Sequence, residues 1–263
     1  YSVLLMTMLV LGAPYWLARM ATSGRYREGL GERLGRVPAA LLAAVAGRQV
    51  VWLHAVSVGE VLAATRLVTE LEAALGDGWV IVVSTTTATG QALARERFGA
   101  ARVFYYPLDF AWAVRAYLRA LGPKMLVLME SELWPRMLVE CGQAGVPVVV
   151  VNARVSDRSY ARGMRMRAVW GRVLRKVDLF LAQSEEDAWR LLATGARGQA
   201  VRVVGNLKFD VRATGENQMA RRIEEMGGTS RVIVAGSTLA NEEEMLLAAW
   251  PRVLHGDPDM ILV

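Results

Sequence analysis

Residues 50–64 read VVWLHAVSVGEVLAA, and this stretch decides the fold of the chain. An apolar run over Val50–Leu53 is followed by the small residues Ser57 and Gly59, and then by Glu60, which opens a helical pattern. This order predicts a strand, a tight turn and a helix. Open α/β sheets bind ligands at the carboxyl ends of their strands, so we expect Glu60 to face a crevice and accept a proton. The alternative is that Glu60 only caps its helix.

Apolar strands alternate with helical segments along residues 48–210. Near-continuous runs of Val, Ile and Leu are typical of parallel strands that helices cover on both faces. We therefore expect the α/β class, with a doubly wound, Rossmann-like domain over these residues. The expected strands are Val50–Leu53, Trp79–Val83, Val103–Tyr105, Met125–Met129, Val146–Val151, Leu179–Ala182 and Val201–Val204. The expected helices are Leu62–Leu75, Gly90–Arg97, Ala111–Leu121, Trp134–Cys141, Arg162–Lys176 and Glu186–Leu192.

A polar link, NLKFDVRATGENQ, separates this domain from residues 211–263, where the strand and helix pattern starts again. The expected elements there are a helix over Met219–Met226, a strand over Val232–Ala235, a helix over Glu242–Val253 and a strand over Met260–Val263. Two strands are fewer than a sheet usually needs. We expect residues 211–263 to be the start of an incomplete second domain, and the chain to be a fragment.

The first 18 residues, YSVLLMTMLVLGAPYWLA, carry no charge and are followed by several arginines. Their length is marginal for a bilayer span, so residues 1–20 are expected to form a short membrane anchor or an interfacial helix. Positive residues follow the anchor, which places the body of the protein in the cytoplasm. Residues 21–47 are expected to form a basic membrane-proximal segment that meets lipid headgroups. A buried soluble helix is the alternative for the first segment.

The composition restricts the partners and cofactors that this chain is expected to bind. Its 263 residues are 54% hydrophobic and 21% charged, with a net charge of +6. No basic run interleaved with aromatic residues accompanies this charge, so anionic small molecules or a lipid surface are expected as partners, and nucleic acid is not. The two histidines fit no metal-binding pattern, and we expect no metal. The single cysteine fits a reducing compartment.

Two further acids follow the apolar run KMLVLM, within the segment MESELWPR of residues 129–136. Glu130 comes directly after the expected strand and Glu132 lies two residues further on, at the sheet edge where Glu60 is expected. Acids gathered at one edge repel each other, which raises the pKa of at least one of them unless cations intervene. The alternative is that these acids cap the following helix and pair with Arg136 or Arg154.

Other polar residues also follow expected strands and are candidates for binding an anion. Thr86 lies in STTTATG (residues 84–90), where hydroxyls and backbone N–H groups precede a helix. Arg154 ends NAR and could hold a phosphate or a carboxylate. Lys208 lies in the polar link and could neutralise a departing phosphate. Ser237 and Thr238 repeat the order of strand, turn and helix in the second domain, where they could hold a nucleotide phosphate.

Six motifs taken together resemble a known family. HAVSVGE, STTTATG, MESELWP, NARVSDRS, AQSEED and GNLKFD are similar to successive motifs of the bacterial 3-deoxy-D-manno-octulosonic acid (Kdo) transferases. The similarity extends from the N-terminal segment to the last residue. It implies a GT-B fold, in which two Rossmann-like domains face each other, and the transfer of Kdo from CMP-Kdo to the lipid A precursor in lipopolysaccharide biosynthesis. It implies neither a cofactor nor a metal.

The resemblance also assigns roles to individual residues. It implies that Glu60 is the proton acceptor and that Glu130 and Lys208 stabilise the transition state. From their places after expected strands, we expect further residues to contact the substrates: Ser57, Gly59, Thr86, Glu132, Arg154, Ser237 and Thr238. The sequence departs from the family pattern after Gly236, where Leu239 and Ala240 stand in a run that usually contains a His and a Gly. Two alternatives remain: a GT-B transferase that uses another nucleotide sugar, and a membrane-attached binding module without catalysis.

Overall fold

A parallel sheet of seven strands occupies the centre of residues 28–210, within the part of the chain that is described. The structure, a computed structural model, describes residues 5–8, 10–15, 28–210, 218–228 and 230–263. The chain divides into two compact units, residues 1–211 and residues 212–263. The strands of the seven-stranded sheet are β1 (Gln49–His54), β2 (Trp79–Thr85), β3 (Val103–Tyr105), β4 (Met125–Met129), β5 (Val148–Ala153), β6 (Leu179–Ala182) and β7 (Val201–Val203).

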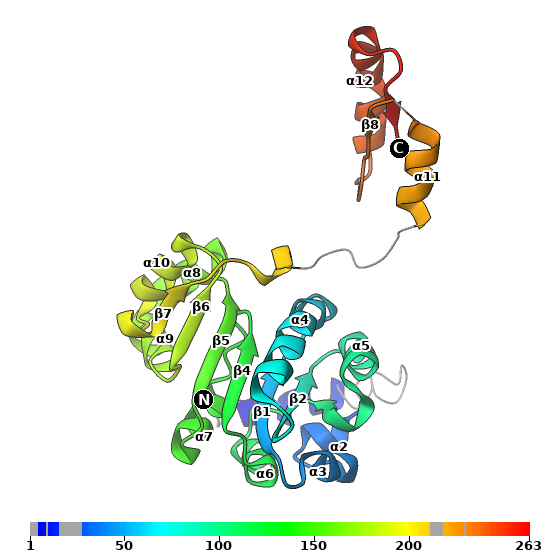
Figure 1. The fold of residues 1–263 in the computed structure, drawn as a ribbon. Helices are drawn as coiled ribbons and strands as arrows, with labels where there is room; N and C mark the ends of the chain where they lie inside the picture. Colours follow the sequence, from blue (N-terminus) through cyan, green and yellow to red (C-terminus); the bar gives the residue numbers. More distant parts are fainter. Residues whose placement is uncertain (1–4, 9, 16–27, 211–217, 229) are drawn as a thin grey trace. The chain divides into compact units, whose positions relative to one another are not determined.

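The strand order is β3-β2-β1-β4-β5-β6-β7, and every described pairing in this sheet is parallel. The chain builds β1, β2 and β3 in one direction and then returns to place β4 on the free side of β1 (Figure 1). The strands read as continuous apolar runs because helices cover both faces of the sheet. The expectation of an α/β class with a parallel sheet is confirmed.

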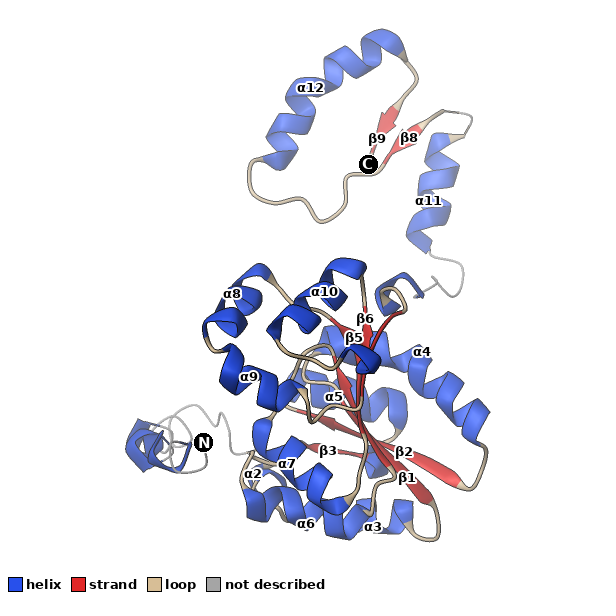
Figure 2. Ribbon diagram, turned by 90° about the vertical axis from the view of Figure 1, so that its left-hand side faces the viewer, coloured by secondary structure: helices blue, strands red, loops and turns tan. Residues whose placement is uncertain are grey.

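The helices of the first unit cover the two faces unequally. Figure 2 shows α4 on one side of the sheet and α7 and α9 on the other. Buried side chains of α4 and α5 form one core with the sheet, and those of α3, α6, α7, α9 and α10 form the core on the opposite face. Within residues 28–210 the α-helices are α2 (Leu30–Arg33), α3 (Ala39–Val45), α4 (Val58–Leu75), α5 (Ala88–Phe98), α6 (Ala111–Leu121), α7 (Pro135–Ala144), α8 (Asp157–Arg165), α9 (Arg167–Leu174) and α10 (Glu185–Thr194). The same residues contain three 3₁₀ helices: η1 (Ala100–Arg102), η2 (Gly198–Ala200) and η3 (Leu207–Asp210).

The sequence predicts one helix over Arg162–Lys176, and the structure has two, α8 and α9. Met166 lies between them with φ −113° and ψ 26°, outside the helical region. The bend allows α9 to pack closely on the end of α10, where Gly195 has a φ of 115°. A Cβ at Gly195 would lie 2.8 Å from the Cα of Gly171 in α9, so this contact requires glycine.

Part of the predicted membrane-proximal segment packs into the core of the first unit. Leu41 and Val45 of α3 are buried in the same cluster as Trp52 of β1. Arg33, expected in a basic segment facing lipid, donates a hydrogen bond of 2.6 Å to the carbonyl of Thr86 and lies over the ring of Tyr105. Burial lowers the pKa of Arg33. This arginine is therefore occupied inside the unit, and the lipid contact of residues 21–47 stays a prediction.

Of the predicted membrane anchor, residues 5–8 and 10–15 are helical, and residues 1–4, 9 and 16–20 lie outside the described residues. Within the described part of the chain, no helix has the length and apolar character that crossing a membrane requires.

The second unit contains a small parallel sheet, in which β8 (Val232–Ile233) pairs with β9 (Ile261–Leu262). The helix α11 (Gln218–Gly227) precedes β8, and α12 (Glu242–Gly256) connects the two strands. This is the order of elements predicted for residues 211–263. None of the α12 residues is buried.

Candidate active site

The candidate site lies where the strand order reverses, between β1 and β4. These two strands pair in parallel from Val51 with Met125 to His54 with Leu128. Ligands of doubly wound sheets bind outside the carboxyl ends of strands at such a reversal. Glu60 follows β1 and Glu130 follows β4, so the fold brings the turns carrying these two predicted acids to neighbouring strand ends.

Glu60 lies in the first turn of α4, with 7% of its surface exposed. One carboxylate oxygen accepts a hydrogen bond from the backbone N–H of Val56 at 2.8 Å, and the other accepts from the hydroxyl of Ser57 at 3.1 Å. Through these two bonds, the side chain of Glu60 caps the turn that precedes α4, as the capping alternative predicts. The same contacts keep the carboxylate in one position at the sheet edge.

The pKa of Glu60 separates it from an ordinary capping acid. Burial raises this pKa to about 7, the two hydrogen bonds from Val56 and Ser57 oppose the rise, and the negative charges of Glu130 and Glu132 add to it. An exposed capping carboxylate would have a pKa near or below its usual value. A carboxylate that titrates near neutrality is suited to accept a proton during a reaction and release it afterwards.

Glu132 belongs to the same group of acids. Its pKa is raised by burial and by the charge of Glu130. The charges of Glu130 and Glu132 both act on Glu60, so the three predicted acids are electrostatic neighbours. Perturbed acids clustered at a strand reversal indicate a functional site.

Glu130 and Asn152 have unusual backbone conformations at the ends of neighbouring strands. Their φ angles are 55° and 59°, in the left-handed region that residues other than glycine rarely occupy. The N–H of Glu130 donates to the carbonyl of Val151 at 2.8 Å, which fixes the end of β4 against β5. Such conformations cost free energy and cluster at functional sites. We regard them as part of the site for that reason.

A different acid caps the helix that follows MESELWP. The backbone N–H groups of Arg136 and Met137 donate to the two carboxylate oxygens of Asp109, at 2.9 and 2.7 Å. Arg136 also pairs with Glu140 at 2.5 Å. The alternative in which Glu130 or Glu132 caps α7 is therefore not supported. No motif marks Asp109 in the sequence, because its partners lie 27 and 28 residues further on.

Lys208 is described by its backbone only, in η3. The buried side chain of Asn152 accepts a hydrogen bond of 3.0 Å from the N–H of Leu207, the residue before Lys208. Gln183 donates to the carbonyl of Asn152 at 3.0 Å. Leu207 also packs against the core that α4 shares with the sheet. The backbone at Lys208 is thus tied to the carboxyl edge of the sheet, and the role of its ammonium group stays a prediction.

The turns after β1 and β2 lie against each other. The N–H groups of Thr86 and Thr87 both donate to the carbonyl of Val56, each at 3.4 Å. The Thr86 hydroxyl is buried and has no hydrogen-bond partner among the described residues. Gly59 is exposed, and no atom lies within 4 Å of the position that a Cβ would take. This leaves backbone accessible beside Glu60.

STTTATG differs in part from the predicted anion-binding loop. Ser84 and Thr85 belong to β2 and are fully buried. Ser84 accepts a hydrogen bond from the indole of Trp52 at 2.7 Å, and Thr85 bonds to Gln91 at 2.5 Å. Of this motif, only Thr86 and Thr87 lie in the turn, and the residues from Ala88 onward belong to α5.

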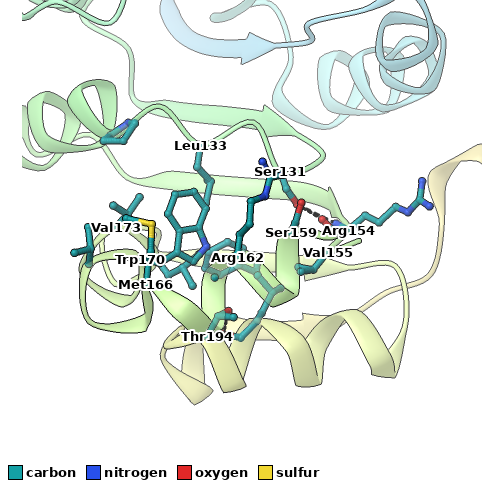
Figure 3. Close-up of a pocket in the computed structure, with 16 residues that line it drawn as sticks. Ser131, Leu133, Arg154, Val155, Ser159, Arg162, Met166, Trp170, Val173 and Thr194 are labelled. Carbon is teal, nitrogen blue, oxygen red and sulfur yellow. Dashed lines mark hydrogen bonds between the residues drawn. The ribbon is translucent and has the colours of Figure 1, made fainter. Parts of the chain in front are cut away.

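Three predicted substrate-binding residues lie in different units: Arg154 in the first, and Ser237 and Thr238 in the second. The backbone of Arg154 bonds to the hydroxyl of Ser131, while its side chain is exposed and points away from the residues around it (Figure 3). Ser237 has a φ of 58°, and the Thr238 hydroxyl donates to Glu243 at 2.7 Å within the second unit. The substrate contacts of all three residues stay predictions.

His54 ends β1, the strand that precedes Glu60. His54 is fully buried and stacks on Tyr106 with 3.9 Å between ring centroids. Burial lowers the pKa of His54 to about 3, so its ring is neutral near pH 7. Among the residues described, no three His, Cys, Asp or Glu side chains are grouped as metal ligands.

Solved structures with the same fold include two sugar-nucleotide enzymes. A UDP-N-acetylglucosamine 2-epimerase superposes with a TM-score of 0.53 at 14% identity, over 82% of this chain and 63% of its own. The UDP-GlcNAc 2-epimerase of Neisseria meningitidis, solved with UDP-GlcNAc, gives 0.52 at 11% identity over 81% of this chain and 64% of its own. These likenesses show the fold alone.

Sequence comparisons identify nearer relatives. The 3-deoxy-D-manno-octulosonic acid transferase of Bordetella pertussis is 37% identical over 247 residues, which are 89% of this chain and 55% of that protein. The transferase of the same name from Haemophilus influenzae is 30% identical over 246 residues, 92% of this chain and 56% of that protein. A bifunctional glycosyltransferase/methyltransferase of Fusobacterium nucleatum is 33% identical over 210 residues, 77% of this chain and 32% of that protein. The chain therefore spans about half, or less, of these curated relatives.

A model of the 3-deoxy-D-manno-octulosonic-acid transferase (kdotransferase) family matches residues 28–211, which contain the whole seven-stranded sheet and the three acids. The match covers the unit in which the site was found and agrees with the motif resemblance. The chain belongs to the 3-deoxy-D-manno-octulosonic acid (Kdo) transferase family.

Proposed function

We propose that the complete protein transfers Kdo from CMP-Kdo to the lipid A precursor, lipid IVA, on the cytoplasmic face of the inner membrane. The reaction is an inverting, metal-independent glycosyl transfer by a GT-B enzyme. Residues 1–211 carry the acceptor side of the site, and residues 212–263 begin the domain that holds the nucleotide sugar. Membership of the Kdo transferase family supports this assignment.

The chemical step is a direct displacement at the anomeric carbon of Kdo. A glucosamine hydroxyl of the acceptor attacks this carbon and gives its proton to the carboxylate of Glu60. The bond between the anomeric carbon and the phosphate oxygen breaks, and CMP leaves with the electron pair. A ketosidic bond replaces it. Lys208 neutralises charge on the departing phosphate, and Glu130 stabilises the positive charge that develops on the sugar ring.

The observation that carries this proposal is the state of Glu60. Its carboxylate is 7% exposed, held by Val56 and Ser57, and has a pKa of about 7 at the point where the strand order reverses. A base whose pKa is close to the working pH is deprotonated in about half of the molecules and is still basic enough to take a proton. Gly59, which has no side chain, leaves room for an acceptor hydroxyl to approach.

Incubation of the full-length protein with CMP-Kdo and lipid A precursor tests the proposal. Mass spectrometry is expected to show the acceptor gaining one or more Kdo masses, with release of CMP, and to show the same product in the presence of a chelator. Product formation with another nucleotide sugar but not with CMP-Kdo would contradict the donor assignment. Product formation that requires an added divalent cation would contradict metal independence.

Two further results bear on the mechanism. Determination of the anomeric configuration of the product by NMR checks inversion, since a retained configuration would exclude a single displacement. A folded Glu60→Gln protein is expected to release CMP at least 100-fold more slowly, because general base catalysis contributes about 10²–10⁴-fold.

A further inference from the structure

A cavity of about 600 Å³ lies beneath α8 and α9, beside the loop that carries Glu130 and Glu132. Figure 3 shows Trp170, Met166 and Val173 together on one side of it, with Arg162 reaching from α8 toward Ser131. Cavities of this size hold small ligands or part of a larger one. Its lining is mainly apolar and includes Leu133, Val155, Met166, Trp170, Val173 and Phe180.

The cavity adjoins the candidate active site through Ser131. Ser131 lines the cavity and stands between Glu130 and Glu132 in the sequence. Its hydroxyl bonds to the backbone of Arg154, another lining residue. A molecule with its apolar part in the cavity would therefore have its polar part close to the three acids.

A strongly basic surface surrounds the cavity. Residues 154–176 read RVSDRSYARGMRMRAVWGRVLRK, with eight Arg or Lys residues and a single Asp. All eight cationic residues are exposed, and none forms an ion pair within the described residues. The single acid, Asp157, pairs with Arg190 of α10 at 2.5 Å. Cations outnumber acids in this stretch by eight to one, so its field attracts anions.

Large apolar side chains are exposed among these cations. The exposed fractions are 60% for Met166, 53% for Val169 and 41% for Met164. Met166 and Val169 also line the cavity. Apolar side chains exposed among arginines are typical of surfaces that bind anionic lipids, because the chains of the lipid cover the apolar groups and its phosphates pair with the arginines. A free phosphate would leave the apolar lining exposed to water.

We propose that the cavity beneath α8 and α9 binds an acyl chain of the acceptor lipid, and that Arg162 contacts a phosphate of the same molecule. The proposal rests on the function proposed above, since it names the part of the chain that holds the acceptor. The chain lies against Trp170, Met166 and Val173, and the sugar lies toward Ser131 and Glu60. The occupant is one acyl chain of a phosphorylated lipid.

Calorimetric titration of the full-length protein with lysophosphatidic acids tests the proposal without any donor. Probes with acyl chains of 8, 10 and 12 carbons are used below the concentration at which they form micelles. Affinity is expected to rise by up to about fourfold for each methylene that enters the cavity. Lysophosphatidylcholine of 12 carbons is expected to bind more weakly than the anionic probe of the same length. Affinity that is independent of chain length would overturn the proposal.

Variants separate binding in the cavity from attraction to the whole surface. Arg162→Gln is expected to weaken binding of the 12-carbon anionic probe about tenfold. Arg165→Gln removes the same charge from the same helix without touching the cavity, and a change of about twofold or less is expected. Equal effects of the two substitutions would show attraction to the surface alone and would contradict the proposed phosphate contact.

A larger residue at the rim tests whether the chain enters the cavity. Val169→Trp is expected to abolish the dependence on chain length, since Val169 is exposed at the lining and can be enlarged without disturbing the core. If that variant fails to fold, Met166→Glu provides the same test by placing a charge in the path of the chain. Chain-length dependence that persists in a folded variant would show that the acyl chain binds elsewhere.

Competition identifies the lipid. Lipid A precursor is expected to displace the 12-carbon probe from the wild-type protein. A probe that binds but is not displaced would assign the cavity to a bilayer phospholipid and overturn the proposed occupant. If the wild-type protein transfers Kdo but shows no chain-dependent binding, the cavity proposal fails alone. If binding and displacement occur without transfer from CMP-Kdo, the proposed function fails and the cavity remains a lipid site.

Discussion

The side-chain oxygen of Asn152 accepts a hydrogen bond from the backbone N–H of Leu207, with 3.0 Å between the two atoms. Asn152 is fully buried at the end of β5, and Leu207 is 55 residues further along the chain. Together with the packing of Leu207 against the core, this contact ties the segment that contains Lys208 to the strand ends beside Glu130. We expect the bond to keep η3 in place against the sheet.

Removal of the Asn152 side chain tests this role. Asn152→Gly keeps a φ of 59° accessible, so the change removes the hydrogen bond without straining the backbone. Loss of a bond worth about 1–1.5 kcal/mol should raise the hydrogen-exchange rate of the Leu207 amide roughly tenfold relative to amides of β4. Asn152→Asp retains an oxygen acceptor and should preserve the protection. Unchanged exchange in Asn152→Gly would mean that other contacts hold η3.

The stability of the protein should depend on pH through Glu60. The pKa of this side chain is about 7 in the folded state, above its ordinary value of 4.5. Between these values the folded state retains a proton that the unfolded state releases, so stability falls as the pH rises from 4.5 to 7. Glu60→Gln does not titrate. The free energy of unfolding of Glu60→Gln, relative to that of the wild type, should therefore increase by on the order of 1–3 kcal/mol between pH 4.5 and pH 7.

Urea denaturation at pH 4.5 and at pH 7.5 measures this difference. The exposed acid Glu70 lies on the same helix, and Glu70→Gln serves as the control for which the difference from wild type should not change with pH. A constant offset between Glu60→Gln and the wild type would mean that Glu60 has an ordinary pKa.

The rate of glycosyl transfer should also depend on the ionisation of Glu60, but it should rise with pH where the stability falls. The carboxylate form is the active base, so kcat/KM should fall about tenfold for each pH unit below 7 and level off above it. Glu130→Gln removes a charge that raises the pKa of Glu60. The midpoint of the profile should then move to lower pH, whatever happens to the maximal rate. If the midpoint of the Glu130→Gln profile is unchanged, the charge of Glu130 does not raise the pKa of Glu60.

The contact between α9 and α10 should depend on glycine. Gly195 has a φ of 115°, and a Cβ there would lie 2.8 Å from the Cα of Gly171. Gly195→Ala should destabilise the protein by about 2–4 kcal/mol, from backbone strain and overpacking together. Gly198→Ala has open space around its Cβ and should change stability by about 0.5 kcal/mol or less. Denaturant midpoints of the two variants decide the matter, and equal midpoints would refute the close contact.

Strands and helices with strong local patterns could be predicted closely. The bounds expected for the strand over Met125–Met129 and the helix over Ala111–Leu121 are those of β4 and α6. Apolar runs and helical periodicity depend on neighbouring residues, so the sequence contains them directly. The break between α8 and α9 was not predicted, because it depends on packing against α10. The six motifs by themselves indicate the family.

The sequence by itself determined the α/β class, the family and the residue types that are available for chemistry. Only the tertiary structure decided that β4 pairs with β1, which brings the turns after these strands together, and that Asp109, not Glu130 or Glu132, caps α7. It also decided that the pKa of Glu60 lies near 7. Pairing between distant strands and removal of a carboxylate from water depend on residues far away in the chain, and no local pattern records them.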